Sequence, residues 1–331
     1  MRPFSLLVKP VGGACNLACR YCVYRGHPGG AIPRRILARA LEGYCALPFA
    51  GKSIAFQGGE PLLSPDYVFD EAERCEAELS VQTNATLMTS AAAERFAAGR
   101  WLVGVSIDGP ARLHDAVRCA SFREAERGVR MLEAAGAEYN LLVVVSKANV
   151  CCAEETYRFL RDNFATRYHQ YIECTGPDPS LAITGDEWGE FLVRLFDEWM
   201  ADGRGGVSIR NFESLASSIV RGHPSMCSYA RDCRHHLVLE HDGSVYPCDF
   251  NVRDDLRLGN IETHTWEEMA QSGKYAAFAA SKAASLPDAC RECEYLDFCN
   301  GDCPRNRRTT CSGLKRFFEH AAPPLAARVL F

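Results

Sequence analysis

Three cysteines lie within eight positions near the N-terminus, in the segment KPVGGACNLACRYCVY at residues 9–24. Cys15, Cys19 and Cys22 are separated by three and then two residues, after a short apolar run. A structural zinc ion binds four ligands and a disulfide joins two cysteines, so three thiols complete neither. A [4Fe–4S] cluster held by three cysteines would instead keep one iron open for a small-molecule ligand. The triplet favours such a cluster, with a zinc site completed by a distant residue as the alternative.

Eight further cysteines lie after residue 226, and their spacing is also typical of metal ligands. They follow the patterns C-x5-C-x14-C and C-x2-C-x5-C-x3-C-x7-C, which together give two sets of four thiols. The members are Cys227, Cys233, Cys248, Cys290, Cys293, Cys299, Cys303 and Cys311. Six other cysteines are scattered, and we expect them to be small buried side chains. They are Cys45, Cys75, Cys119, Cys151, Cys152 and Cys174.

The composition is that of an ordinary globular protein. The chain has 331 residues, 47% hydrophobic and 24% charged, and this length exceeds what one hydrophobic core usually serves. We expect a large domain at 1–215 and a smaller one at 216–331. The 37 basic and 42 acidic residues give a net charge of −5 without a basic tract, so nucleic acid is not an expected partner. No apolar run suits a signal peptide or a membrane span, and 17 cysteines then fit a cytoplasmic metalloprotein.

Apolar, strand-like runs alternate with helical patterns, which is typical of βα units with a parallel sheet. We expect strands at 4–9, 53–59, 79–84, 101–108, 139–146 and 168–174. Helices are expected at 33–46, 65–79, 90–99, 121–136, 153–164 and 186–203. Six units are too few for a closed eight-stranded barrel, so the expected fold class is α/β with a partial (β/α)6 barrel. From about residue 216 we expect a cysteine-rich, irregular region with one hairpin at 236–248, turning on Asp242 and Gly243.

The residues that could do chemistry follow the predicted strands. The cysteine triplet comes after the first strand, GGEP at 58–61 after the second, and SIDGP at 106–110 ends the fourth. In βα barrels the loops at the carboxyl ends of the strands carry the chemistry. All three segments therefore belong to the expected active end of the barrel.

With CNLACRYC at 15–22 and GGEP at 58–61, the chain resembles the radical S-adenosylmethionine superfamily. The resemblance implies that Cys15, Cys19 and Cys22 hold a [4Fe–4S] cluster. It also implies that the amino and carboxylate groups of S-adenosylmethionine bind the open iron of that cluster.

By the same resemblance, contacts with S-adenosylmethionine fall at Tyr21, Gly59, Ser106, Arg118 and Thr175. A glycine at 59 would let backbone approach the cofactor, Ser106 could reach a ribose, and the planar fork of Arg118 suits a carboxylate. The alternative for Arg118 is a surface salt bridge. Thr175 stands where the family usually has an apolar residue.

The C-terminal cysteines resemble the SPASM extension of that superfamily, which carries two auxiliary [4Fe–4S] clusters. The resemblance implies one ligand set of Cys227, Cys233, Cys248 and Cys303 and another of Cys290, Cys293, Cys299 and Cys311. Full ligation by four cysteines leaves no open iron, so these clusters would move electrons or hold structure. Zinc-ribbon knuckles are the alternative.

Three segments further resemble anaerobic sulfatase-maturating enzymes: SLLVKP at 5–10, FQGGEP at 56–61 and GSVYPCDFNV at 243–252. That resemblance implies oxidation of a cysteine or serine in an unfolded sulfatase to Cα-formylglycine, through a 5′-deoxyadenosyl radical. It makes Asp249 the general base and places Tyr24 at the substrate pocket. The alternative for Asp249 is a turn residue that caps a backbone N–H. A reducing partner such as flavodoxin or ferredoxin and a monomeric enzyme are also expected.

Two other functions are also compatible with this sequence. One is radical modification of a ribosomally made peptide through thioether or carbon crosslinks, because the SPASM extension also serves that chemistry. The triplet begins at residue 15, so we expect no leader-binding domain ahead of it, which favours the sulfatase substrate. The other is a non-catalytic metal-binding or regulatory protein, against which the intact triplet, Arg118 and Asp249 argue together.

Overall fold

A computed structural model describes residues 3–202 and 206–330. Within these residues, ten strands form one sheet in the order β10–β9–β8–β1–β2–β3–β4–β5–β6–β7. Their bounds are β1 Ser5–Val8, β2 Ser53–Phe56, β3 Glu78–Thr83, β4 Leu102–Ser106, β5 Glu138–Val145, β6 Tyr168–Glu173, β7 Ser208–Ile209, β8 His236–Leu239, β9 Ser244–Tyr246 and β10 Gly259–Asn260. Strands β1 to β6 are parallel neighbours in chain order, which confirms the partial barrel of six β/α units.

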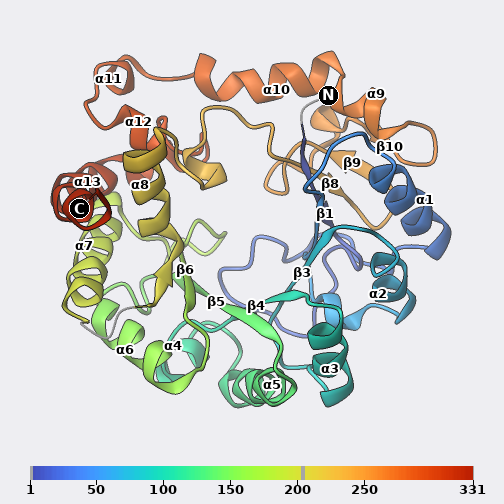
Figure 1. Ribbon diagram of the computed structural model, residues 1–331, viewed down its shortest axis with the longest axis horizontal. Helices are drawn as coiled ribbons and strands as arrows, with labels where there is room; N and C mark the ends of the chain where they lie inside the picture. Colours follow the sequence, from blue (N-terminus) through green and yellow to red (C-terminus); the bar gives the residue numbers. More distant parts are fainter. Residues whose placement is uncertain (1–2, 203–205, 331) are drawn as a thin grey trace.

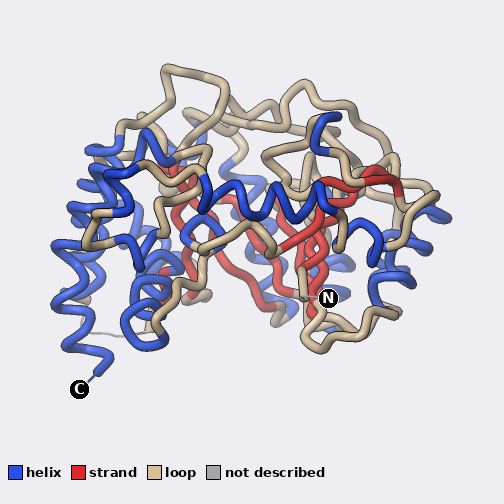
Figure 2. The backbone as a smooth tube through the Cα atoms, turned by 90° about the horizontal axis from the view of Figure 1, so that it is seen from above, coloured by secondary structure: helices blue, strands red, loops and turns tan. Residues whose placement is uncertain are grey.

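Helices surround the outer side of this curved sheet (Figure 1). The first group is α1 Arg34–Cys45, α2 Tyr67–Ala72, α3 Ser90–Ala98, α4 Ala111–Asp115, α5 Phe122–Ala135, α6 Ala153–Asn163 and α7 Gly185–Ala201. The C-terminal part adds α8 Arg210–Arg221, α9 Trp266–Ala270, α10 Gly273–Ala284, α11 Asp288–Arg291, α12 Leu296–Cys299 and α13 Arg307–Leu330. A view turned by 90° places the strands in the interior, with helices on both flanks (Figure 2).

The periodicity of the apolar residues explains these elements. In α5 the buried residues Phe122, Ala125, Val129 and Leu132 recur every three to four positions, which is the spacing of one helix face. In β5 every second residue is buried, from Tyr139 onward, because successive side chains of a strand point to opposite faces.

The alternation of strands and helices continues beyond α7, although no strand was predicted between the helix at 186–203 and the hairpin at 236–248. Strand β7 pairs in parallel with β6, and β8 pairs in parallel with β1, with Leu7 opposite Val238. These strands are too short to carry a period, and β8 finds its partner far away in the chain. The predicted hairpin is confirmed, because β8 and β9 are antiparallel and Gly243 has a φ of +86°, which glycine tolerates.

The C-terminal part is more helical than predicted. Helix α13 packs along α7 and α8, and its buried residues Leu314, Phe317, Phe318, Ala321 and Leu325 follow a helical spacing. The prediction of an irregular region was therefore wrong for this segment, whose apolar residues repeat with a helical period. Helix α8 runs across the proposed domain boundary at 215/216, which stays a prediction.

Three smaller differences concern local features. The helix expected at 65–79 is α2 and ends at Ala72, because the chain must turn before β3 begins at Glu78. The helix expected at 186–203 is α7, whose last residue is Ala201, and residue 203 lies outside the described residues. Of the six scattered cysteines, Cys174 is buried, and Cys45 and Cys75 are partly buried against the core. Cys152 is also partly buried, and the expectation of buried side chains was wrong for Cys119 and Cys151, which are exposed.

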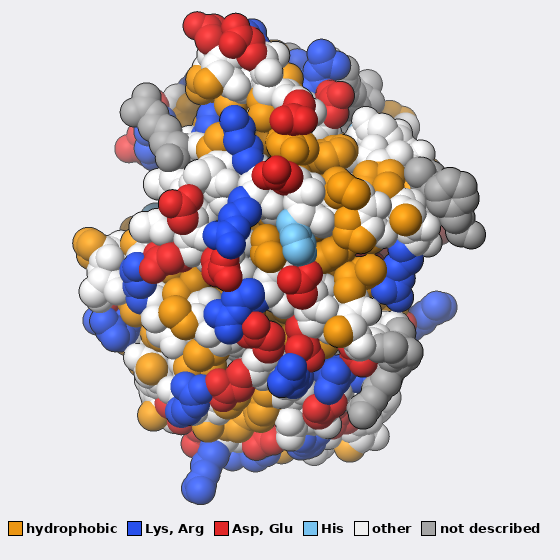
Figure 3. All heavy atoms as spheres, turned by 90° about the vertical axis from the view of Figure 1, so that its left-hand side faces the viewer, with side chains coloured by type: hydrophobic (Ala, Val, Ile, Leu, Met, Phe, Trp, Pro, Cys, Tyr) orange, Lys and Arg blue, Asp and Glu red, His pale blue; other side chains and the backbone are white. Residues whose placement is uncertain are grey.

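The face formed by α7 and α13 carries acidic and basic side chains side by side (Figure 3). Polar contacts join neighbouring helices there: His320 Nε2 lies 2.6 Å from Asp197 Oδ1, and an ion pair places Arg194 Nη2 2.6 Å from Glu154 Oε2. Among the described helices, none is long and apolar enough to cross a membrane.

Candidate active site

The predicted motifs meet at the carboxyl ends of the parallel strands. The triplet loop follows β1, the GGEP loop follows β2, Ser106 ends β4 and Thr175 follows β6. The β8–β9 hairpin lies beside β1 and carries Cys248 and Asp249 at its end. One region of the barrel therefore collects residues from nearly the whole chain, as expected for loops at this end of a βα sheet.

The triplet loop is held against the GGEP loop by close backbone contacts. Glu60 N donates to Ala14 O at 2.8 Å. A Cβ on Gly59 would lie only 1.8 Å from that same carbonyl oxygen. The contact between the two loops thus requires a glycine at position 59. This contact explains the glycine without the approach of a cofactor. The contact of Gly59 with S-adenosylmethionine stays a prediction.

Glu60 ties the GGEP loop to the end of β3. Its buried carboxylate accepts hydrogen bonds from Thr83 Oγ1 at 2.6 Å and from Asn84 N at 2.8 Å. Burial raises the pKa of this carboxyl group. Sequence reasoning assigned Glu60 no role, although an acidic residue directly after an apolar strand was a visible signal.

The three thiols of the triplet lie close enough to influence one another. Cys15 is exposed, Cys19 is buried and Cys22 is half-buried. Burial raises the pKa of Cys19 to about 11, an effect that Arg118 opposes and Cys22 strengthens. Burial also raises the pKa of Cys15, and Cys22 adds to the rise. Free thiols gathered in this way fit the donor set of an iron–sulfur cluster, because a bound cation favours the thiolate form.

Arg118 forms a buried ion pair. Its Nε donates to Asp108 Oδ2 at 2.8 Å, Tyr21 Oη donates to the same oxygen, and the guanidinium lies 5.2 Å from the centre of the Tyr21 ring. Asp108 Oδ1 accepts from Val144 N at 2.8 Å. Arg118 is only 7% exposed, so the surface salt bridge considered for it was wrong. Its contact with S-adenosylmethionine, like that of Tyr21, stays a prediction.

Ser106 and Thr175 lie at strand ends, as predicted. Ser106 Oγ accepts a hydrogen bond from Gln82 Nε2 at 3.1 Å. The Thr175 carbonyl oxygen accepts one from Arg305 Nη2 at 2.9 Å. The cofactor roles given to both residues stay predictions.

Asp249 lies in a polar network that three other segments build. Its Oδ2 accepts a hydrogen bond from Gln57 Nε2 at 3.2 Å and lies 3.9 Å from Lys9 Nζ. Its backbone carbonyl accepts one from Tyr24 Oη at 3.0 Å. The side chain is 16% exposed. Within the described part of the chain no backbone N–H donates to this carboxylate, so the turn-capping alternative lacks the contact that it needs.

Lys9 is the buried cation of this network, with a side chain that is 1% exposed. Its Nζ donates to Tyr24 Oη and lies 4.0 Å from the centre of the Tyr24 ring. Burial lowers the pKa of Lys9 while Asp249 raises it, and burial raises the pKa of Tyr24. Sequence reasoning missed Lys9 and Gln57, although a lysine that ends an apolar strand in SLLVKP was a visible signal.

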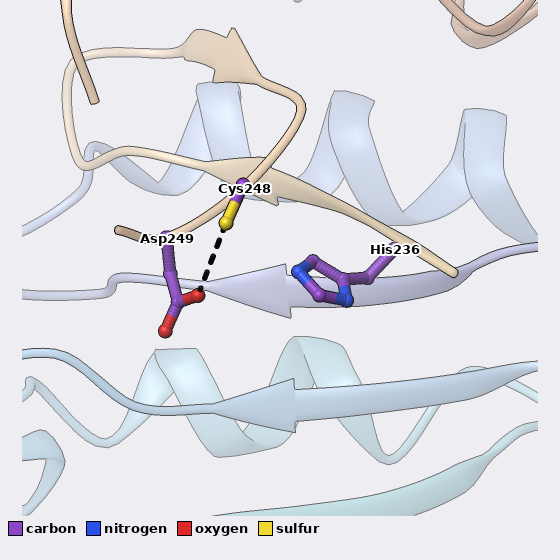
Figure 4. A group of neighbouring side chains, drawn as sticks. All are labelled: His236, Cys248 and Asp249. Carbon is purple, nitrogen blue, oxygen red and sulfur yellow. Dashed lines mark hydrogen bonds between the residues drawn. The ribbon is translucent and has the colours of Figure 1, made fainter. Parts of the chain in front are cut away.

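Figure 4 shows His236, Cys248 and Asp249 facing one another, with ligand atoms that all lie within 4.8 Å. The dashed line joins Cys248 Sγ to Asp249 Oδ1 at 3.9 Å. His236 Nε2 is buried without a hydrogen-bond partner among the described residues, and burial lowers the pKa of His236. The imidazole of His236 therefore borders both the predicted cluster ligand and the predicted base. Sequence reasoning missed it.

The structure brings several of the C-terminal cysteines near one another, and the two ligand sets stay a prediction. Cys290, Cys293, Cys299 and Cys311 all line one cavity of about 60 Å³. In the other set, burial raises the pKa of Cys227 to about 11, and the thiols of Cys233 and Cys303 add to that rise. Burial raises the pKa of Cys248 to about 12, with a contribution from Cys227. These free thiols fit clusters with four cysteine ligands each, and the individual assignments stay predictions.

An open cavity of about 430 Å³ borders Asp249. Tyr24 and Thr175 line it together with Asp249, and Arg25, Arg253 and Arg305 contribute basic side chains. Its volume lies within the range of ligand-binding sites. The predicted base, the predicted substrate contact and one predicted cofactor contact thus share one opening to solvent.

Comparison with known proteins relates these residues to a family. Residues 10–160 match the model of the radical SAM superfamily, and residues 227–294 match that of the SPASM iron–sulfur cluster-binding domain. The serine-type anaerobic sulfatase-maturating enzyme of Bacteroides thetaiotaomicron is 32% identical, over 97% of this chain and 90% of its own. The cysteine-type enzyme of Clostridium perfringens is 32% identical, over 98% of both chains.

Solved structures agree with these relatives. Native anSMEcpe with bound AdoMet and the Cp18Cys peptide superposes with a TM-score of 0.92 at 31% identity, covering 99% of both chains. SuiB of Streptococcus suis, bound to S-adenosylmethionine, has a TM-score of 0.71 at 17% identity and shows the shared fold alone. Because its relatives match over nearly their whole length, this chain belongs to the family of anaerobic sulfatase-maturating enzymes within the radical SAM superfamily.

Proposed function

We propose that this protein oxidises a cysteine or serine in a sulfatase peptide to Cα-formylglycine. The position of Asp249 carries the proposal, because its carboxylate borders the open cavity and is held by Gln57 beside Lys9. A carboxylate placed in this way can accept the thiol or hydroxyl proton of a bound target residue. The relatives include a serine-type and a cysteine-type enzyme, so the proposal covers both targets.

The cysteines would hold the groups that the rest of the reaction needs. Cys15, Cys19 and Cys22 would bind the cluster that carries S-adenosylmethionine, and the eight C-terminal cysteines would bind two auxiliary clusters. When bound, these groups supply the 5′-deoxyadenosyl radical that takes a hydrogen atom from the target Cβ and the acceptor for the electron left behind.

The protein residues manage the proton and the geometry. Asp249 takes the proton from the target sulfur or oxygen, so a thiol target becomes a thioaldehyde, which water converts to the aldehyde with release of sulfide. Lys9 holds the carboxylate of Asp249, and Tyr24 holds its backbone carbonyl, through the contacts described above. The buried pair of Arg118 and Asp108 holds the Tyr21 hydroxyl, where one cofactor contact is predicted.

Three features of the setting belong to the same proposal. A flavodoxin or ferredoxin would deliver the electron that starts the reaction, the enzyme would act as a monomer, and it would act in the cytoplasm. The 17 cysteines support the last point, because free thiols persist in a reducing compartment.

The proposal is tested with peptides that carry the sulfatase signature, a target residue followed by x-Pro-x-Arg. Reduced holoenzyme is incubated anaerobically with S-adenosylmethionine and peptides whose target is Cys, Ser or, as a control, Ala. We expect mass spectrometry to find formylglycine in the first two peptides and no change in the third. Formation of 5′-deoxyadenosine without any change of peptide mass would instead favour crosslinking of a precursor peptide.

A further inference from the structure

The cavity beside Asp249 is lined by more positive than negative side chains. Its charged residues are Arg25, Asp249, Arg253 and Arg305, with His27 beside them. Arg253 already has a partner, since its Nη2 lies 3.1 Å from Asp255 Oδ2. Asp249 in turn faces the buried Lys9 at 3.9 Å. Once these pairs are matched, Arg25 and Arg305 remain as excess positive charge on the cavity wall.

These two arginines, which we name the basic rim, have no ion-pair partner among the described residues. Arg25 is exposed and belongs to the loop that follows the cysteine triplet. Arg305 comes from the C-terminal part, donates to the Thr175 carbonyl at 2.9 Å and lies 4.2 Å from the centre of the Phe250 ring. Glu173, whose pKa burial raises and Arg305 lowers, accepts a hydrogen bond from Asn306 Nδ2 and forms no ion pair with Arg305 among the described residues.

The chemistry of the basic rim selects an anion. A guanidinium presents N–H donors in a planar fork that matches a carboxylate, and such charge-assisted hydrogen bonds are stronger than neutral ones. Thr175 and Phe250 restrict the orientation of Arg305, so less side-chain freedom is lost when it binds a ligand. We propose that the basic rim binds an acidic side chain of the substrate peptide close to the target residue. This inference rests on the proposed function, since it takes the peptide that carries the target as the ligand of the cavity.

The reach of an extended peptide limits where that acidic residue stands. An extended chain advances about 3.5 Å per residue, so a carboxylate within about three residues of a target at Asp249 can contact the cavity wall. The sulfatase signature already fixes a proline and an arginine among the four residues after the target, and the basic rim repels the arginine. We therefore place the acidic residue before the target.

The test compares three labelled peptides that share the signature Cys-x-Pro-x-Arg and carry Glu, Gln or Lys two positions before the target cysteine. Fluorescence anisotropy measures the binding of each peptide to holoenzyme with S-adenosylmethionine and without reductant, so that no turnover occurs. We expect the Glu peptide to bind roughly fivefold to tenfold more tightly than the Gln peptide, and the Lys peptide to bind most weakly. Added salt should reduce these differences.

Variants of the basic rim locate the effect. Arg25→Gln and Arg305→Gln should each reduce the preference for the Glu peptide and leave the Gln peptide within about twofold. Arg112→Gln is the matched control, because Arg112 is an exposed arginine paired with Glu155 and does not line this cavity. If a variant fails to assemble its clusters, the three peptides on the unaltered enzyme still decide.

The outcomes separate this inference from the proposed function. Equal affinities for the three peptides, or tightest binding of the Lys peptide, would overturn the inference even if all three are converted to formylglycine. A clear preference for Glu that disappears in the rim variants would uphold it. If that preference occurs but no peptide gains formylglycine after reduction, the rim stands and the sulfatase substrate is rejected.

Discussion

At the scale of single residues, Asp249 is positioned by side chains that no local motif connects. Gln57 follows β2, Lys9 follows β1 and Tyr24 lies after the cysteine triplet, yet all three contact this one residue. The carboxylate keeps 16% exposure toward the cavity. Its neighbours thus fix its direction and leave it accessible, which is what a proton acceptor for a bound peptide requires.

Replacing Asp249 with Asn tests this role. Asparagine keeps the shape and can still accept a hydrogen bond from Gln57, but its amide is not a base. We expect full iron content and formation of formylglycine slower by about 10²- to 10⁴-fold, the usual contribution of a positioned general base. Mass spectrometry of the peptide and iron analysis of the protein measure both quantities. Asp254→Asn, which alters an exposed acidic residue in the following loop, should leave the rate unchanged.

Near-normal turnover by Asp249→Asn at full iron content would show that another group takes the proton. The next candidate for the base is His236, which lies beside this carboxylate. Its ring nitrogen Nε2 is buried and has no hydrogen-bond partner among the described residues.

Some residues of this site could be predicted from the sequence around them, and others could not. The cysteine spacing and the residue after Cys248 can be read from a few consecutive positions, so both were predicted. Lys9 and His236 gain their meaning only through neighbours distant in the chain. Arg118 shows the same limit, since only its buried contact with Asp108 distinguishes it from a surface residue.

At the scale of elements, the contact between the triplet loop and the GGEP loop is the feature most sensitive to change. A methyl group on Gly59 would lie 1.8 Å from a backbone oxygen, which cannot rotate away as a side chain would. We expect Gly59→Ala to displace the triplet loop and to remove about a third of the iron, one of three four-iron clusters. Iron analysis and the yield of 5′-deoxyadenosine measure the loss.

Gly273→Ala is the matched control for this substitution. A Cβ at position 273 meets open space, so its iron content should equal that of the unaltered protein. Normal iron content and cofactor cleavage in Gly59→Ala would show that the loops tolerate the methyl group and that the contact is not critical.

The elements also show where periodicity suffices and where it fails. Strands β1 to β6 are apolar runs set between helical patterns, so their order was predictable. Strand β8 was predicted only as part of a hairpin. Its parallel pairing with β1 was not predicted, because the two strands lie at opposite ends of the chain. Helix α13 carries a clear apolar period, from Leu314 to Leu325, which the dense cysteines before it overshadowed.

At the scale of the whole molecule, the C-terminal part is anchored in the barrel by a shared core. Trp266 of α9 donates to the Ala40 carbonyl at 2.8 Å, and its ring centre lies 6.1 Å from that of Phe4. Helix α13 packs on α7 in the same way. The short helices α11 and α12 differ, because neither contains a buried residue although each carries a predicted cluster ligand.

Removal of iron should therefore affect the molecule unevenly. Helices of four residues are not stable on their own, and metal binding supplies on the order of 10 kcal/mol of folding free energy in small metal domains. We expect chelation to raise the amide exchange rates of α11 and α12 by about 10²-fold or more, while β1 to β6 stay protected. Hydrogen exchange measured by mass spectrometry on loaded and iron-free protein reports each segment. The second half of α13 is the internal control, since its apolar face is buried against α7 without metal ligands. Equal protection of α11 and α12 in both states would mean that the polypeptide alone holds these helices, and the clusters would then have no structural role there.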